Sequence, residues 1–112
     1  MDTPSSRLVA AAQAVTATED RDGRRLVVRR PGALDRLRLF KAAGPNLVSN
    51  AGWMGMATLA CSVVEIEGVP MPVTTTEAQV EALVARLGDA GLAAVAAVLA
   101  PQAASVGPHA KN

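Results

Sequence analysis

Residues 50–72 read NAGWMGMATLACSVVEIEGVPMP and contain the transition that decides the fold class. After Asn50, a preferred N-cap residue, apolar residues recur at helical spacing from Trp53 to Val64. Two short β-branched segments then flank Glu67-Gly68, a pair that suits a two-residue hairpin turn. These segments are residues 63–66 and 69–73. A helix followed directly by a hairpin predicts an α+β fold.

A second β-hairpin is predicted before this stretch. Residues 14–19 and 24–30 flank Asp20-Arg-Asp-Gly23, which ends in a glycine where a turn needs positive φ. In the later segment Leu26 and Val28 share one face of the strand, because side chains alternate along a strand. We expect that face to contact the core and the opposite, arginine-bearing face to contact water or a partner.

Three further helices are predicted from apolar spacing and from the residues that bound them. The first covers residues 33–43, ends at Gly44-Pro45 and has Leu34, Leu37 and Phe40 on one face. The second covers residues 77–87, and Gly88 ends it. It begins at a capping sequence that fits either Thr74 with Glu77 or Thr76 with Gln79. The third begins at Asp89, and Pro101 stops it.

The predicted organisation is one α-rich α+β domain over residues 14–100. The chain has 112 residues, which fits a single domain. We expect an N-terminal β-hairpin with about four helices and, at most, a short second hairpin. Residues 1–13 are expected to form a flexible N-terminal extension, and residues 101–112 a disordered tail.

Composition and charge narrow the classes of function. The net charge of +1 lacks the surplus of Lys and Arg that general nucleic-acid binders use, although residues 19–41 hold eight of the eleven basic residues. The single cysteine cannot form an intramolecular disulfide. The longest unbroken apolar run, residues 92–100, is shorter than the roughly 20 residues that span a bilayer. We expect a cytoplasmic protein that binds neither nucleic acid nor membrane.

The residues that common catalytic and metal sites require are poorly placed. His109 is the only histidine and lies in the expected disordered tail, away from any nucleophile. One cysteine and one distant histidine cannot supply a zinc site. Gly52 and Gly55 fall within a helical pattern and lack the Lys and Ser or Thr that follow in a phosphate-binding loop. We expect no enzymatic activity, no cofactor and no metal.

The candidate partner-binding residues come from the basic segment and from the start of the 50–64 helix. Trp53 opens the apolar stripe of that helix, so it is either a core residue or a binding hot spot. The arginines form either a solvated face or a contact with an acidic partner. Cys61, on the same stripe as Trp53, is most simply a small buried side chain. The candidates are Arg25, Arg29, Arg36, Arg38, Trp53 and Met54.

Three stretches, taken in order, are RRPGALDRLRLFKAAGP (29–45), NAGWMGMATLACSVVEIEGVPMP (50–72) and TEAQVEALVARLGDAGLAAVAAVL (76–99). Together they resemble small phage tail assembly chaperones encoded in the tail modules of siphophage-like genomes and prophages. The resemblance covers about residues 15–100 and rests on packing and turn signatures rather than on a catalytic motif. It implies a non-enzymatic protein that keeps the tape measure protein soluble in the host bacterial cytoplasm.

The same resemblance implies that tail tube subunits polymerise around the tape measure protein and that the chaperone is absent from the finished particle. Tail tube subunits are therefore further candidate partners, and self-association stays open. Two other functions compete with a chaperone. One is a virion structural protein, such as a tail completion subunit.

The other competing function is a small DNA-binding regulator with a helix-turn-helix formed by residues 34–43 and 50–64. Two features argue against this function. The connection over residues 44–49 is longer than the usual three or four residues, and the second helix carries no basic residue.

Overall fold

A computed structural model describes residues 14–100. The fold is α+β, as the sequence predicts. The elements in chain order are strands β1 (Thr16–Glu19) and β2 (Arg25–Val28), helices α2 (Ala33–Leu47) and α3 (Ala51–Cys61), strands β3 (Val63–Ile66) and β4 (Val69–Pro70), and helix α4 (Glu77–Leu99). The predictions of a flexible extension over 1–13 and a disordered tail over 101–112 lie outside the described residues.

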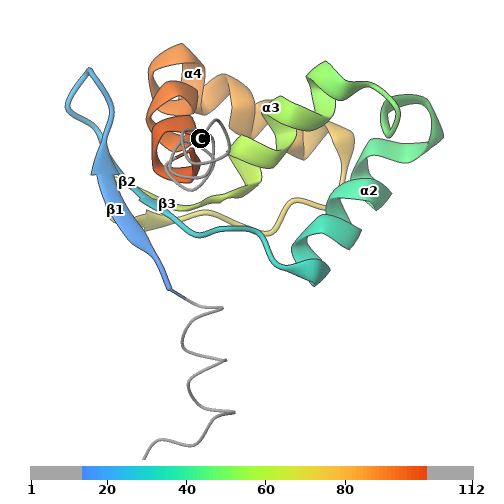
Figure 1. Ribbon diagram of the computed structural model, residues 1–112, viewed down its shortest axis with the longest axis horizontal. Coiled ribbons are helices and arrows are strands. Elements are labelled where there is room, and N and C mark those ends of the chain that lie inside the picture. Colours follow the sequence, from blue (N-terminus) through green and yellow to red (C-terminus); the bar gives the residue numbers. More distant parts are fainter. Residues whose placement is uncertain (1–13, 101–112) are drawn as a thin grey trace, which may run out of the picture.

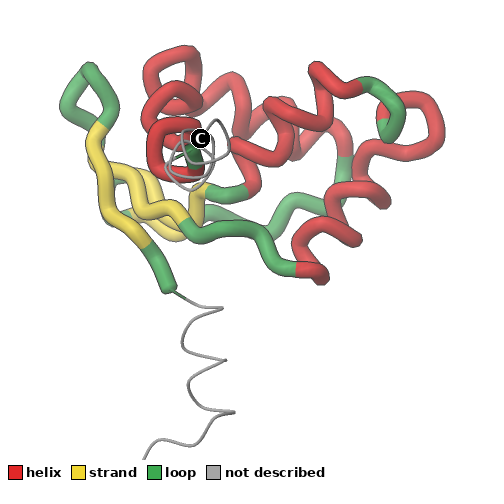
Figure 2. Tube along the Cα trace, in the orientation of Figure 1, coloured by secondary structure: helices red, strands yellow, loops and turns green. Residues whose placement is uncertain are grey.

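The two predicted hairpins form one sheet. The four strands pair antiparallel in the order β1-β2-β3-β4, because β2 and β3 also pair, with Leu26 opposite Ile66. Helices α3 and α4 lie on one side of this sheet (Figure 1). Helix α2 lies at the end of the molecule away from the β1–β2 turn, and Figure 2 shows the same division between strands and helices.

A register shift between Val27 and Val28 determines which side chains of β3 reach the core. Strict alternation would place Val63 and Ile66, three residues apart, on opposite faces of the strand. The irregularity brings both to the core face, where they are 3% and 2% exposed. They join Leu26 and Val28 there, which confirms the predicted core face of the first hairpin.

The core consists of aliphatic side chains of small and medium size. The main cluster lies between the sheet and the helices and contains Leu26, Val28, Ala60, Val63, Ile66, Leu83, Leu87, Leu92 and Val95. A second, smaller cluster joins α2, α3 and α4 through Leu39, Ala42, Ala57 and Val80. The buried residues of α3 are both alanines, which allow the helix backbone to approach its neighbours closely.

The prediction of four helices is wrong by one. Gly88 has φ of 64° and ψ of −174°, which interrupts the helical geometry as expected of a terminating glycine. The chain nevertheless turns directly into the next helical residues, so residues 77–99 form a single kinked helix. Gly44, with φ of 72°, kinks α2 in the same way, and α2 continues to Leu47 instead of ending at Ala43.

The predicted starts of α2, α3 and α4 are confirmed, but the predicted start at Asp89 lies inside α4, and several element ends differ from the predicted ones. The Asn50 side chain accepts a hydrogen bond from the Trp53 N–H, and the Thr76 side chain accepts one from the Gln79 N–H. The second of these is the alternative register considered for α4. Helix α3 ends at Cys61 because the chain enters β3 at Val63, and β4 covers only Val69–Pro70.

Helix α4 is, by length and composition, long and apolar enough to cross a membrane. The sequence prediction rested on the longest unbroken apolar run and therefore did not identify this helix as long and apolar enough to span a membrane. In the fold, α4 is the central helix of the core, where Val80, Leu83, Leu87 and Val95 are buried. The core helix of a globular domain has the same length and apolar character.

Candidate partner-binding site

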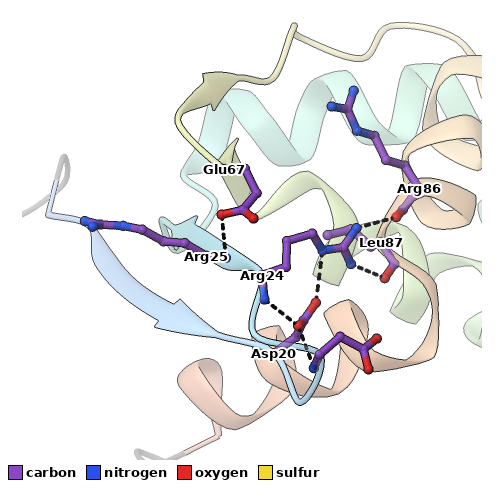
Figure 3. A network of polar contacts seen from close by, with 7 residues as sticks. Asp20, Arg24, Arg25, Glu67, Arg86 and Leu87 are labelled. Carbon is purple, nitrogen blue, oxygen red and sulfur yellow. Dashed lines mark hydrogen bonds and ion pairs between the residues drawn. The ribbon is translucent and has the colours of Figure 1, made fainter.

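Arg24 joins the β1–β2 turn to the middle of α4. Its Nε donates to Asp20 Oδ2 at 3.0 Å, and its two terminal nitrogens donate to the carbonyls of Arg86 and Leu87 at 2.9 and 2.6 Å (Figure 3). A break such as that at Gly88 removes helical N–H partners from the carbonyls before it. Arg24 supplies replacement donors, so its charge serves the fold.

Three of the other six arginines of the basic segment also have acceptors within the chain. Arg29 donates to both carboxylate oxygens of Asp35, at 3.1 and 3.5 Å. Arg36 donates to the Pro31 carbonyl, and Arg30 to the Leu99 carbonyl near the end of α4. The basic segment is therefore not one continuous binding face.

The side chains of Arg25 and Arg38 have no hydrogen-bond or ion-pair partner within residues 14–100. Figure 3 shows the Arg25 side chain extending away from the Arg24 network, while its backbone N–H donates to Glu67 Oε2 at 3.1 Å. Arg25 lies on β2 and Arg38 on α2. Of the four candidate arginines, these two are thus the ones available to a partner.

Asp35 anchors the start of α2. Burial alone would raise the pKa of its carboxyl, but the Gly32 N–H and Arg29 donate to it, and the charges of Arg29 and Arg38 add to the effect. The pKa is lowered from 3.8 as a result. The one acidic side chain of α2 is therefore charged at neutral pH. It is bonded to Arg29 and partly offsets the charge of Arg38, three residues further along the helix.

Trp53 and Met54 lie apart from the arginines, half-buried against the smaller core cluster. The indole Nε1 of Trp53 donates to Glu81 Oε2 at 3.0 Å, which joins α3 to α4. Trp53 therefore combines a packing role with a partly accessible edge. The neighbouring pocket has a volume of about 100 Å³ and is lined by Trp53, Met56, Ala57, Val80, Glu81 and Val84.

Cys61 is half-buried, as a small core side chain on the Trp53 stripe would be. Burial raises the pKa of its thiol, and the contact of Sγ with Thr74 Oγ1, at 3.3 Å, only partly opposes this effect. A raised pKa keeps the group as a thiol, which is a poor nucleophile. Cys61 is therefore suited to packing.

The main candidate binding feature that the sequence did not predict is an exposed apolar face on α2. Leu34, Leu37 and Phe40 are 56%, 64% and 48% exposed. The opposite side of α2 is buried through Leu39, Ala42 and Ala43. We call the exposed residues Leu34, Leu37 and Phe40 the α2 face.

The α2 face has basic neighbours. Arg38 follows Leu34 by four residues, and Lys41 follows Leu37 by four, so each lies one turn from an exposed leucine. Leu37, Arg38, Phe40 and Lys41 line one open surface depression. This arrangement suits an apolar ligand with negative charge beside it.

Within residues 14–100, no group of three or more His, Cys, Asp or Glu side chains is arranged to hold a metal ion. The described part of the chain offers instead an apolar surface with two basic side chains beside it. Comparison with known proteins finds no family model, no curated protein and no solved structure that matches this chain.

Proposed function

We propose that this protein is a non-enzymatic phage tail assembly chaperone that binds the tape measure protein while the tail tube assembles. The observation that carries the proposal is the exposure of the α2 face. The chain has one Phe and one Trp, and the Phe lies 48% exposed on a helix surface rather than in the core. Large apolar side chains that stay exposed in this way mark interaction surfaces when they are contiguous.

The spacing of the α2 face fits a helical partner. Leu34, Leu37 and Phe40 are three residues apart, so they form a single row along one side of α2. Such a row matches the apolar stripe of an amphipathic helix, which binds through side chains spaced by about one turn. The tape measure proteins served by the chaperones that this chain resembles are long and helical.

The proposal places the protein in the host bacterial cytoplasm during assembly and outside the finished particle. A DNA-binding regulator is a weaker alternative, although the structure leaves only one of the two arguments against it. Only three residues, 48–50, separate α2 from α3, so the long connection expected from the sequence is absent. Helix α3 still carries no Lys or Arg that could contact bases or phosphates.

Co-expression with the tape measure protein of the same tail module tests the proposal. We expect the tape measure protein to remain in the supernatant after high-speed centrifugation when this chain is present and to pellet when it is absent. An unchanged pellet contradicts the chaperone function. Mass spectrometry of purified particles and of lysate separates a chaperone, found only in the lysate, from a virion structural protein, found in both.

A further inference from the structure

We infer that the α2 face binds an amphipathic helix of a partner protein whose apolar stripe is flanked by acidic side chains. This inference rests on the proposed function and specifies its binding site and the charge of its partner. The row from Leu34 to Phe40 extends over about 9 Å, given a rise of about 1.5 Å per residue. It therefore covers less than two turns of a partner helix, which would present two or three apolar side chains.

Charge complementarity identifies the flanking residues of the partner. The cations beside the row are the exposed Lys41 and the half-buried Arg38, and neither has a hydrogen-bond or ion-pair acceptor within residues 14–100. The one acidic residue of α2, Asp35, is held by Arg29 at 3.1 Å. A partner helix with Glu or Asp beside its apolar stripe would pair with Arg38 and Lys41, whereas a basic helix would be repelled.

The same charges disfavour a second copy of this chain as the occupant. Pairing of two α2 faces would bring Arg38 and Lys41 of one copy close to those of the other. Repulsion between like charges at a partly dehydrated interface opposes such a dimer. The C-terminal residues 101–112 are also a poor match for the α2 face. This segment contains no acidic residue, and Val106 is its only large aliphatic side chain.

Three synthetic helical peptides of 18 residues serve as probes. The first has a leucine stripe flanked by Glu, the second has the same stripe flanked by Lys, and the third keeps the Glu flanks but replaces the leucines with Ser. We expect the full chain to bind the first peptide about five- to tenfold more tightly than the second at low salt. Binding of the third is expected to be undetectable, because apolar contact supplies most of the affinity.

Two double variants and two matched controls locate the site. Leu37→Ala with Phe40→Ala is expected to weaken binding of the Glu-flanked peptide at least about thirtyfold. Arg38→Glu with Lys41→Glu is expected to reverse the preference towards the Lys-flanked peptide. The controls are Val15→Ala with Val69→Ala, which alters exposed apolar residues elsewhere, and Arg21→Glu with Arg86→Glu, which makes the same charge change. Both controls should bind like the wild type.

Several results would overturn the inference. These are equal binding of the Glu- and Lys-flanked peptides, loss of binding in the controls, and a wild-type dimer in sedimentation that L37A/F40A converts to monomer. Another is binding to vesicles of phosphatidylserine and phosphatidylcholine that L37A/F40A abolishes, because the face would then contact membrane.

The proposed function can fail separately. If L37A/F40A solubilises the tape measure protein as well as the wild type does, the function stands and the α2 site is wrong. If the Glu-flanked peptide binds at the α2 face but the tape measure protein still pellets, the site stands and the function is wrong.

Discussion

The β1–β2 turn with the middle of α4, and the α2 face at the other end of the molecule, use the same residue types in opposite ways. At the first, Leu87 is 1% exposed and Arg24 donates three side-chain hydrogen bonds within the chain. At the second, Leu37 is 64% exposed, and Arg38 has no partner among residues 14–100. We therefore expect the first region to determine stability and the second to determine binding.

The largest expected effect comes from the same substitution made in each region. Leu87→Ala should lower the free energy of unfolding by about 2–5 kcal/mol, because it removes a buried side chain and leaves a cavity. Leu37→Ala should change it by less than about 0.5 kcal/mol, since that side chain is already mostly in water. Urea unfolding followed by circular dichroism measures both. Equal losses would show that the α2 face is packed in solution.

Substitutions of Arg24 and Arg38 are expected to give the next largest difference in the free energy of unfolding between the two regions. Arg24→Ala should lower the free energy of unfolding by about 1–3 kcal/mol, because the carbonyls of Arg86 and Leu87 lose donors that are charged. Arg24→Lys should restore only part of the loss, since one ammonium group cannot reach all of these acceptors together. Arg38→Ala should have little effect on unfolding in the same urea titration. If Arg24→Ala leaves the free energy of unfolding unchanged, water replaces these hydrogen bonds without cost.

Substitutions of two helical glycines are expected to change the free energy of unfolding in opposite directions. A Cβ at Gly91 would lie 2.9 Å from Arg24 Nη2 and 3.0 Å from two atoms of the Leu87 side chain, while a Cβ at Gly55 meets nothing within 4 Å. Gly91→Ala should therefore cost about 1 kcal/mol of stability, after the gain in helix propensity is included. Gly55→Ala should stabilise α3 by about 0.5–1 kcal/mol.

Thermal unfolding of both glycine variants measures whether each substitution lowers or raises stability. In an Arg24→Ala background, Gly91→Ala should be less destabilising, because one of the two close neighbours of the new methyl group is gone. The Leu87 contact remains and should preserve part of the cost. A stabilising Gly91→Ala in the wild-type background would show that the Arg24 guanidinium moves aside easily.

The local parts of the fold could be predicted from the sequence because local residues determine them. The turn at Asp20–Gly23, the Asn50 cap and the Thr76–Gln79 register each depend on residues within a few positions of one another. The joining of two hairpins into one sheet depends on contacts between residues about 40 positions apart, such as Leu26 with Ile66. No periodicity in the sequence encodes that pairing.

The candidate site was harder to predict, because α2 has apolar residues on two sides. Leu34, Leu37 and Phe40 form one row, and Leu39 with Ala42 and Ala43 forms the other. Helical spacing allows either row to face the core, and packing against Ala57 and Val80 selects the second. Likewise, the structural role of Arg24 depends on the placement of the Gly88 break beside the β1–β2 turn, which only the tertiary fold shows.

The smallest effect is expected from acid, at Asp20 in the β1–β2 turn. The hydrogen bond from the Arg24 N–H is the largest cause that lowers the pKa of this carboxyl from 3.8, with the Arg24 side chain and the Asp22 N–H adding to it. A pKa that is lower in the folded state makes the unfolded state bind protons more readily. The stabilisation is therefore complete above about pH 4 and is lost as the pH falls through the folded pKa.

Asp20→Asn isolates this contribution. The Asn oxygen can still accept from the backbone N–H groups of Asp22 and Arg24, but the variant has no carboxyl to titrate. In urea unfolding between about pH 2 and pH 7, the free energy of unfolding of the variant should therefore depend less steeply on pH below about 4 than that of the wild type. Some dependence should remain, because Asp35 also has a lowered pKa. Parallel curves for wild type and variant would show that the Asp20 carboxylate does not stabilise the turn, and that Arg24 is held there by the α4 carbonyls alone.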